Sequence, residues 1–305
     1  MKPLVSIILL TYNQEDSIGR AFDSLLMQRT SVPFEIVVGE DASTDETRRI
    51  CEEYVRRNPQ IIRLMPAGQN KGVVRNFFDC LGECRGKYIS DCAGDDCWLD
   101  ENRLERQVRQ LEDDERVSAV CCDVEWDNTY TGQKQIVKAE RVTKIHELYR
   151  SPMQICLSAM LYRADVVRRA VATKPDVVGN TEFGLEDLPI MAELVANGSV
   201  ERTPIVGLRY SIHDGSISNS SNHNKMFDFA AGVAHCSIVV AQHYGVDCER
   251  IRVEMNRRIG YMVSLALHCD DRERRRRAIA VARLWRYRLP WKTRMKLMLL
   301  EIKKG

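Results

Sequence analysis

The chain has 305 residues, of which 44% are hydrophobic and 29% are charged. This length suits one large domain or two small ones, and the composition is that of an ordinary soluble globular protein. No run of about 18 apolar residues occurs, so we predict no membrane-spanning helix. The N-terminus, Met1-Lys2-Pro3, leads straight into a strand-like segment and lacks the features of a signal peptide. We therefore expect a cytoplasmic protein.

The formal net charge is only +2, but it is unevenly distributed. Residues 250–305 carry a net charge of +12, whereas residues 1–249 carry −10. An acidic body with a basic tail indicates two different tasks. The 11 cysteines are expected to be free thiols in a reducing compartment. Four of them lie at residues 80–97, but their spacing does not repeat the C-x2-C pattern of zinc sites, so a zinc site is disfavoured.

The first part of the chain alternates between predicted strands and predicted helices. Short apolar runs indicate buried strands, and apolar positions at helical spacing indicate amphipathic helices. Strands separated by helices predict an α/β fold with a doubly wound, mainly parallel sheet, whose ligands bind at the carboxyl ends of the strands. In chain order, we predict strands at 4–10, 34–39, 61–65, 86–91 and 117–124, with helices at 15–28, 43–58, 73–84 and 100–115.

After residue 127 the alternation weakens. Residues 128–133 predict a hairpin turn, and residues 151–215 mix short strands and helices. From about residue 225 the pattern is helical to the end, with a break at Pro290. We expect an α/β domain at 1–220, made of halves 1–127 and 128–220, followed by a helical, basic region at 221–305.

Polar side chains follow three of the predicted strands. Because the carboxyl ends of parallel strands meet at one edge of a sheet, these side chains are expected to lie close together. Two adjacent carboxylates repel each other unless a cation lies between them. The pair Asp95-Asp96 therefore indicates a site for Mg²⁺ or Mn²⁺ shared with a substrate diphosphate. The alternative is a solvated acidic turn that caps the next helix. The segments are Thr11-Tyr12-Asn13, Glu40-Asp41, and Asp91 followed by Asp95-Asp96.

These segments resemble motifs of the family 2 glycosyltransferases, which have the GT-A fold, and among them the bacterial enzymes that make surface polysaccharides. Each motif is weak alone, but six of them occur in the order of the family, over about residues 4–220. Position 97 departs slightly, because Cys97 stands where one branch has tyrosine. The matching pieces are 5–8 with 11–13, 40–45, 70–72, 94–98, 186–187 and 209–218.

The resemblance implies a role for each strand end. Asp96 would bind the divalent metal, Mn²⁺ or Mg²⁺, and Asp95 would face the ribose or the diphosphate. His213, in the segment Arg209-x3-His213-x-Gly215-Ser216, would contact the diphosphate or the metal, with an ordinary loop or core histidine as the alternative. The nucleobase, usually uracil in this family, would be hydrogen-bonded by Asp41 in a pocket lined by Thr11, Tyr12 and Glu15.

Asp187 matches the catalytic base of the family. An inverting transfer needs a carboxylate that takes the proton from the acceptor hydroxyl as its oxygen attacks. The alternative is that Glu186-Asp187 caps a helix beginning at Leu188-Pro189. Both interpretations hold together, because a helix N-terminus favours a carboxylate.

The expected function is an inverting, metal-dependent transfer of a sugar from a nucleoside-diphosphate sugar, expected to be UDP-linked. The expected acceptor is a hydroxyl of a glycan or of a lipid-linked glycan, on family analogy. One alternative is a sugar nucleotidyltransferase, but the loop at residues 11–15 has no glycine and ends in an acidic residue. A second alternative is a catalytically inactive nucleotide-sugar binder or assembly partner, against which the joint presence of Asp41, Asp96 and Asp187 argues.

The basic tail allows two interpretations. Trp291, Met295, Met298 and Ile302 share one face of the last predicted helix, with basic residues beside it. Such a helix suits the headgroup region of an anionic membrane, which would place the protein on the inner face of the cell membrane. Alternatively, the stripe packs on the catalytic domain and the arginines are solvated or pair with acidic groups. Nucleic-acid binding is not expected, because no recognised nucleic-acid module accompanies the charge.

Overall fold

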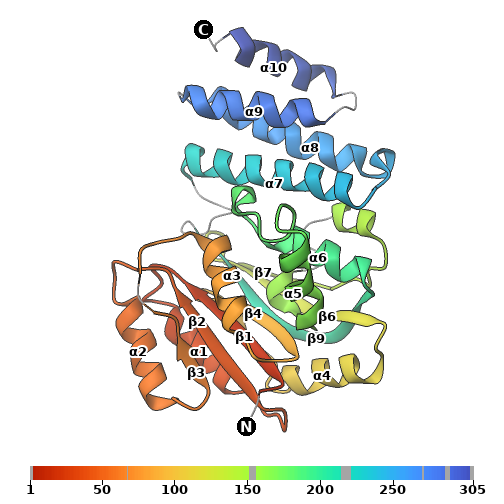
Figure 1. Cartoon of the computed structure of the whole chain (residues 1–305). Coiled ribbons are helices and arrows are strands. Elements are labelled where there is room, and N and C mark those ends of the chain that lie inside the picture. Colours follow the sequence, from red (N-terminus) through yellow and green to blue (C-terminus); the bar gives the residue numbers. More distant parts are fainter. Residues whose placement is uncertain are drawn as a thin grey trace.

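The computed structural model describes residues 3–66, 68–150, 156–213, 221–269, 271–285 and 289–302. An α/β body forms the N-terminal part, and helices stacked above it form the C-terminal part (Figure 1). The body is built on a single sheet, and the chain crosses from one half of this sheet to the other after residue 93. The predicted α/β class and the predicted helical C-terminal region are both confirmed.

The first half of the sheet is parallel. Its central strand, β1 (Val5–Thr11), is fully buried from Val5 to Leu9, as its apolar run predicts. Strand order reverses beside β1, so a ligand crevice is expected at the carboxyl ends of β1 and β4. The strands lie in the order β3 (Ile62–Leu64), β2 (Phe34–Glu40), β1 (Val5–Thr11) and β4 (Tyr88–Ala93), and the connecting helices are α1 (Ile18–Leu26), α2 (Thr47–Arg57) and α3 (Val73–Glu83).

The second half of the sheet is mixed. The predicted strand at 117–124 is present as β6 (Val117–Asn128), and the predicted hairpin follows it, because β7 (Gln133–Val137) pairs antiparallel with β6. β8 (Met160–Arg163) lies antiparallel between β4 and β6 and joins the two halves. β9 (Ser199–Ile212) runs parallel to β6 and pairs on its other side with the short β5 (Cys97–Trp98).

Helices and single turns complete the body. α4 follows the amphipathic prediction at 100–115, with Leu104, Val108 and Leu111 buried. α6 begins at Asp187, close to the helix start predicted from Glu186-Asp187. The remaining elements are α4 (Arg103–Asp113), α5 (Ala164–Thr173), α6 (Asp187–Ala196) and the 3₁₀ turns η1 (Ile145–Tyr149), η2 (Leu157–Ala159) and η3 (Thr181–Phe183).

The C-terminal helices stack on one another above the body (Figure 1). Three of them begin with a side-chain cap, because Asn222, Asp247 and Asp271 each accept a hydrogen bond from a backbone N–H of the first turn. The fourth begins directly after Pro290, the predicted break. They are α7 (His223–His243), α8 (Cys248–Leu267), α9 (Arg272–Leu284) and α10 (Trp291–Ile302).

α7 attaches this stack to the body. A Cβ added to Gly232 of α7 would lie 1.9 Å from the carbonyl oxygen of Phe183, so only glycine permits this close approach to η3. Tyr149 also donates a hydrogen bond to the carbonyl of Ser237 in α7, at 2.8 Å. Among the described residues, no helix is long and apolar enough to cross a membrane.

Candidate active site

Loops after β1 and β2 are cross-linked at the carboxyl edge of the sheet. The side chain of Asn13 accepts a hydrogen bond from the backbone N–H of Thr44 at 2.8 Å, and the backbone N–H of Asn13 donates to the Ser43 hydroxyl at 2.9 Å. Glu15 accepts from the backbone N–H of Glu46 at 2.8 Å. Asn13 adopts a positive φ of 51°, a conformation that asparagine tolerates well. These bonds bring the predicted segments 11–15 and 40–45 together.

Asp41 binds a third loop. Its carboxylate accepts hydrogen bonds from the backbone N–H groups of Lys71 at 2.8 Å and Gly72 at 2.9 Å, and Asn70 donates to its carbonyl at 3.0 Å. The segment 70–72, one of the pieces that match the family motifs, therefore lies beside the second strand end. Asp41 is buried and both of its carboxylate oxygens are engaged with this turn, so it shapes the loop that would surround a nucleobase.

The other residues predicted to line a base pocket differ in exposure. Thr11 is buried, and its hydroxyl donates to the side chain of Gln14 at 2.8 Å. Tyr12 is 46% exposed and presents its ring at the edge of the sheet. An exposed aromatic ring at a strand end offers a flat apolar surface for stacking. Glu15 faces the start of α2, where its carboxylate accepts the hydrogen bond from the backbone N–H of Glu46.

Asp96 is a buried carboxylate with an open oxygen. It is 2% exposed, and Oδ1 accepts a hydrogen bond from the backbone N–H of Ser211 at 2.9 Å. Oδ2 has no hydrogen-bond partner within the described residues. Burial and the neighbouring charge of Asp95 raise the pKa of Asp96 well above its usual value. A buried carboxylate oxygen without a donor is costly unless a cation or a ligand meets it, so this side chain suits a divalent metal.

Asp95 and His213 are brought together across 118 residues of sequence, with Nε2 of His213 2.7 Å from Oδ2 of Asp95. The pairing of β5 with β9 makes this contact possible, because Cys97 lies opposite Arg209 in the ladder. Among the described residues, no three His, Cys, Asp or Glu side chains are arranged to hold a metal ion.

Asp187 is the first residue of α6, is half-buried, and lies close enough to Asp91 for their charges to interact. Burial raises its pKa from 3.8 to about 6. Burial also raises the pKa of Glu186, and the charges of Asp187 and Asp91 add to this. Glu186 occupies the N-cap position, but its side chain makes no capping hydrogen bond. The capping interpretation therefore does not hold for Glu186.

Asp91 is a site residue that the sequence placed at a strand end without giving it a role. Oδ2 accepts a hydrogen bond from the Ser158 hydroxyl at 2.7 Å, whereas Oδ1 is buried without a partner among the described residues. Burial and the charge of Asp187 raise its pKa to about 7, against the hydrogen bond from Ser158 and the charge of Arg103. The signal that could have found it is a charged residue inside an otherwise apolar strand.

Arg103 is a buried cation in this acidic region, and the sequence pattern did not point to it as a site residue. Its guanidinium lies 3.9 Å from the centre of the Trp98 ring and donates to the carbonyl of Ser158 at 2.8 Å. Ser158 thus connects Arg103 to Asp91. In sequence, Arg103 reads as one of several arginines of an amphipathic helix, so only the fold reveals that it is fully buried.

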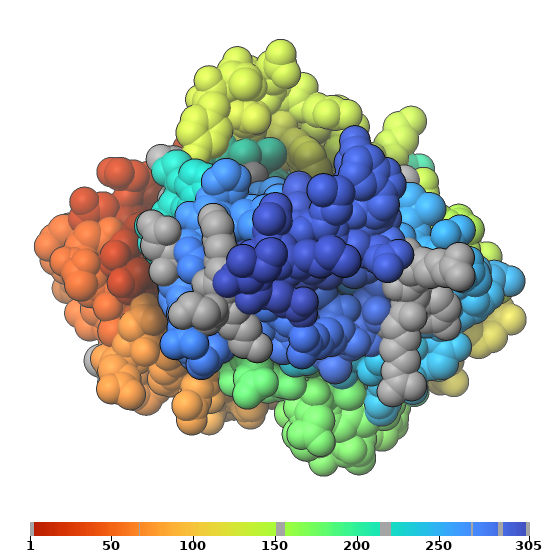
Figure 2. All heavy atoms as spheres, turned by 90° about the horizontal axis from the view of Figure 1, so that it is seen from above, coloured from red at the N-terminus to blue at the C-terminus, as the bar shows by residue number. Residues whose placement is uncertain are grey.

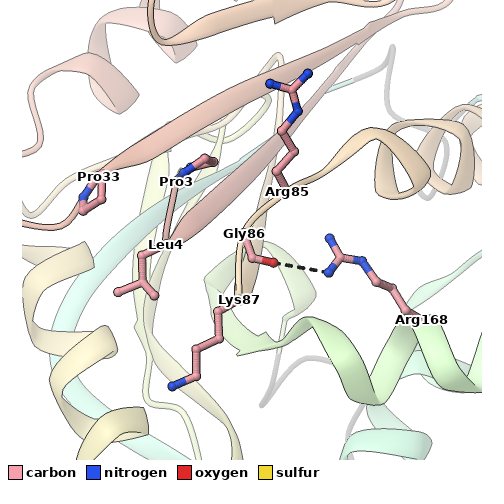
Figure 3. A pocket seen from close by; sticks show the side chains of 7 residues that line it. All are labelled: Pro3, Leu4, Pro33, Arg85, Gly86, Lys87 and Arg168. Atoms are coloured by element: carbon pink, nitrogen blue, oxygen red, sulfur yellow. Dashed lines mark hydrogen bonds between the residues drawn. The ribbon is translucent and has the colours of Figure 1, made fainter. Parts of the chain in front are cut away.

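The cysteines and a cavity complete the description of the body. All 11 cysteines are free, as predicted. A cavity of about 480 Å³ opens at the opposite edge of the sheet, near the start of β1 and β4 (Figure 3). Arg168 reaches across it to the carbonyl of Gly86, at 3.3 Å. The cavity is lined by Pro3, Leu4, Pro33, Arg85, Gly86, Lys87 and Arg168, so none of the predicted site residues contributes to it.

The pKa of Asp187 leads to a prediction for the pH dependence of catalysis. If Asp187 is the general base that the sequence motif implies, it acts in its ionised form, so kcat should fall as the pH drops through about 6, by roughly tenfold per unit below that value. A base with the ordinary pKa of 3.8 would keep kcat flat down to about pH 5. Steady-state rates between pH 5 and 8 at saturating donor and acceptor check this, and a flat profile would contradict it.

The fold is shared with solved glycosyltransferases. The structure matches Staphylococcus aureus TarS in complex with UDP-GlcNAc, with a TM-score of 0.60 and 16% sequence identity over 97% of this chain and 88% of that one. It also matches the mannosyltransferase PcManGT from Pyrobaculum calidifontis in complex with GDP-Man and Mn²⁺, with a TM-score of 0.57 and 15% identity over 100% of this chain and 87% of that one. The GT-A fold predicted from the sequence motifs is thus confirmed.

Sequence comparison specifies the family. Residues 6–170, more than half of the chain, match Glycosyl transferase family 2. The chain belongs to this family.

Two relatives illustrate the range of similarity. An uncharacterized protein of Mycobacterium tuberculosis is 44% identical over 108 residues, which are 35% of this chain and 31% of that protein. This chain thus matches about a third of the length of that relative. A UDP-Glc:alpha-D-GlcNAc-diphosphoundecaprenol beta-1,3-glucosyltransferase of Escherichia coli is 27% identical over 219 residues, which are 70% of this chain and 80% of that enzyme.

Proposed function

We propose that this glycosyltransferase inverts the anomeric centre of a nucleoside-diphosphate sugar, with Asp187 as the general base. The observation that carries the proposal is the geometry of two carboxylates. Asp187 is half-buried with a pKa of about 6, whereas Asp96 is fully buried with one open oxygen. Asp187 can therefore exchange a proton near neutral pH, whereas Asp96 is suited to binding a cation.

The donor would lie along the carboxyl edge of the sheet. The nucleobase would meet the loops of Tyr12 and Asp41, and we propose uracil as the base, in line with the neighbour that binds UDP-GlcNAc. The exposed ring of Tyr12 supports stacking, and Thr11 and Glu15 hold the loop around it. The ribose and diphosphate would then reach the turn that carries Asp95.

Asp96 would hold the divalent metal, Mn²⁺ or Mg²⁺, together with the donor diphosphate. A cation there would neutralise the negative charge that builds on the leaving diphosphate. The neighbour with GDP-Man also contains Mn²⁺. His213, fixed against Asp95, would orient that carboxylate and approach the same phosphates.

Asp187 would take the proton of the acceptor hydroxyl as its oxygen attacks the anomeric carbon opposite the diphosphate. Its position at the N-terminus of α6 helps to hold the ionised form, because the helix dipole favours a negative charge there. The nearby negative charges of Asp91 and Glu186 act in the opposite sense and favour proton uptake. A base of this kind captures a proton from the hydroxyl and later releases it to solvent.

The acceptor would be a hydroxyl of a glycan or of a lipid-linked glycan. The activity of the Escherichia coli relative, on a diphosphoundecaprenol-linked sugar, supports an acceptor of this class. Such an acceptor is met at the inner face of the cell membrane, so the enzyme would act in the cytoplasm, at the membrane periphery. We assign donor binding to residues 1–127, acceptor binding to 128–220, and attachment to 221–305.

The direct test is a screen of UDP-, GDP- and TDP-sugars for metal-dependent hydrolysis and transfer by the full chain. We expect turnover with a UDP-sugar in the presence of Mn²⁺ or Mg²⁺, and none after chelation of the metal. Binding of UDP without any turnover would instead identify an inactive nucleotide-sugar binder. Release of inorganic diphosphate from a nucleoside triphosphate and a sugar phosphate would identify a nucleotidyltransferase.

A further inference from the structure

The last helix presents an apolar stripe to the outside. In α10, Trp291 is 66% exposed and Ile302 is 77% exposed. Met295, Met298 and Leu299 are exposed beside them, at helical spacing. Figure 2 shows α10, in dark blue, on the outermost surface of the helical stack, with this side uncovered. One of the two interpretations of the sequence expected the stripe to pack on the catalytic domain. The exposure of these side chains shows that it does not.

The opposite face of α10 fixes the orientation of the stripe. Thr293 and Leu300 are buried, and Thr293 lies against Gly260 of α8, where an added Cβ would come within 3.3 Å of its hydroxyl. Lys296 donates a hydrogen bond to the Ser264 hydroxyl of α8 at 2.7 Å. One face thus holds the helix on α8, and the apolar stripe points away from the protein.

The basic residues of the C-terminal region differ in whether a carboxylate pairs with them. Arg274 of α9 pairs with Asp228 of α7 at 2.7 Å, and Arg277 lies 3.7 Å from the same carboxylate. These two arginines connect helices of the stack. Lys292 and Arg294 of α10, in contrast, have no carboxylate partner within the described part of the chain. Nζ of Lys292 lies 5.8 Å from the centre of the Trp291 ring, at the edge of the stripe.

We propose that α10 docks on an anionic lipid surface, with the stripe in the headgroup region and Lys292 and Arg294 facing lipid phosphates. Tryptophan and methionine with flanking unpaired cations are the composition of helices that lie in this region. A second copy of the chain fits less well, because a two-fold contact through the stripe would bring the same unpaired cations of both copies together. This inference goes beyond sugar transfer and does not depend on the donor or the acceptor.

Vesicle flotation of the full-length protein tests the proposal. We expect it to float with vesicles of phosphatidylglycerol and phosphatidylcholine at low salt, and not with phosphatidylcholine alone. The double substitution Trp291→Glu/Met298→Glu should weaken binding by at least about tenfold, because it places charge in the apolar stripe. The matched control is Val253→Glu, on an 82% exposed apolar side chain of α8, and it should bind like the wild type.

A second pair of variants separates charge from apolar contact. Arg294→Glu should weaken binding and its salt dependence, whereas Arg109→Glu, on an 84% exposed arginine of α4, should not. The proposal fails if the wild-type protein ignores anionic vesicles, or if the control variants lose binding equally. It also fails if light scattering shows an oligomer that the α10 variants dissociate, since the stripe is then a contact between copies. Donor hydrolysis in solution should remain unchanged in all four variants, so failure here is distinct from failure of the proposed function.

Discussion

Replacement of Asp187 by Asn is expected to lower kcat by about 10²–10⁴-fold while leaving the affinity for UDP unchanged. Asparagine has nearly the same shape but cannot take the acceptor proton. The site is already crowded with carboxylates, so loss of one charge should not destabilise the fold. Steady-state kinetics and calorimetric titration with UDP measure the two effects. The acid limb of the pH profile should disappear together with the activity.

A matched control makes the Asp187 result specific. Asp165 lies in the first turn of α5, where its side chain is 70% exposed. Asp165→Asn removes the same charge from the same kind of helix position and should leave kcat within about twofold of the wild type, as for most surface substitutions. If Asp187→Asn keeps the wild-type kcat, or loses UDP binding instead, the base lies elsewhere in the acidic region.

Replacement of Asp96 by Asn is expected to remove metal-dependent transfer, with a loss of at least about 10³-fold in kcat/KM, because the metal contributes several kcal/mol to charge neutralisation. The amide oxygen can still accept the hydrogen bond from Ser211, so the turn should keep its shape. Since the carboxylate is buried with an open oxygen, Tm should stay the same or rise.

A control variant and a metal titration make the Asp96 result specific. Asp113→Asn, at the exposed end of α4, is the charge-matched control and should retain full activity. Titration with Mn²⁺ should show that the wild type requires the metal for donor binding and that the Asp96 variant does not respond to it. Near-normal, metal-dependent activity of Asp96→Asn would place the metal on another residue.

Features with a local signal could be predicted from the sequence. The buried parallel strands have continuous apolar runs, and the polar segments 11–15 and 40–45 directly follow two of them. Their proximity follows from the rule that the carboxyl ends of parallel strands meet at one edge of the sheet. The alternation of strand and helix was therefore enough to place Asp41 and Asp96 at one edge of the sheet.

Features that depend on distant pairing could not be predicted. Asp96 accepts its hydrogen bond from Ser211, which is 115 residues away, through a ladder between a two-residue strand and an irregular one. The link from Arg103 through Ser158 to Asp91 crosses three elements without any motif. Charge counting likewise could not separate Arg274, which pairs within the helical stack, from Arg294, which does not.

The stack of C-terminal helices also sets the distance between the site and the outer surface of α10. Asp187 lies near α7, where burial and then the charge of Asp187 raise the pKa of the Cys236 thiol. α7, the pair α8 and α9, and α10 follow as successive layers (Figure 1). Packed helices lie about 8–10 Å apart, so roughly 20 Å separates α7 from α10. If α10 contacts a membrane, the stack would hold the site at this distance from the lipid. The enzyme would then select acceptors whose reactive hydroxyl projects well above the lipid headgroups, and would not reach a hydroxyl at the level of the headgroups.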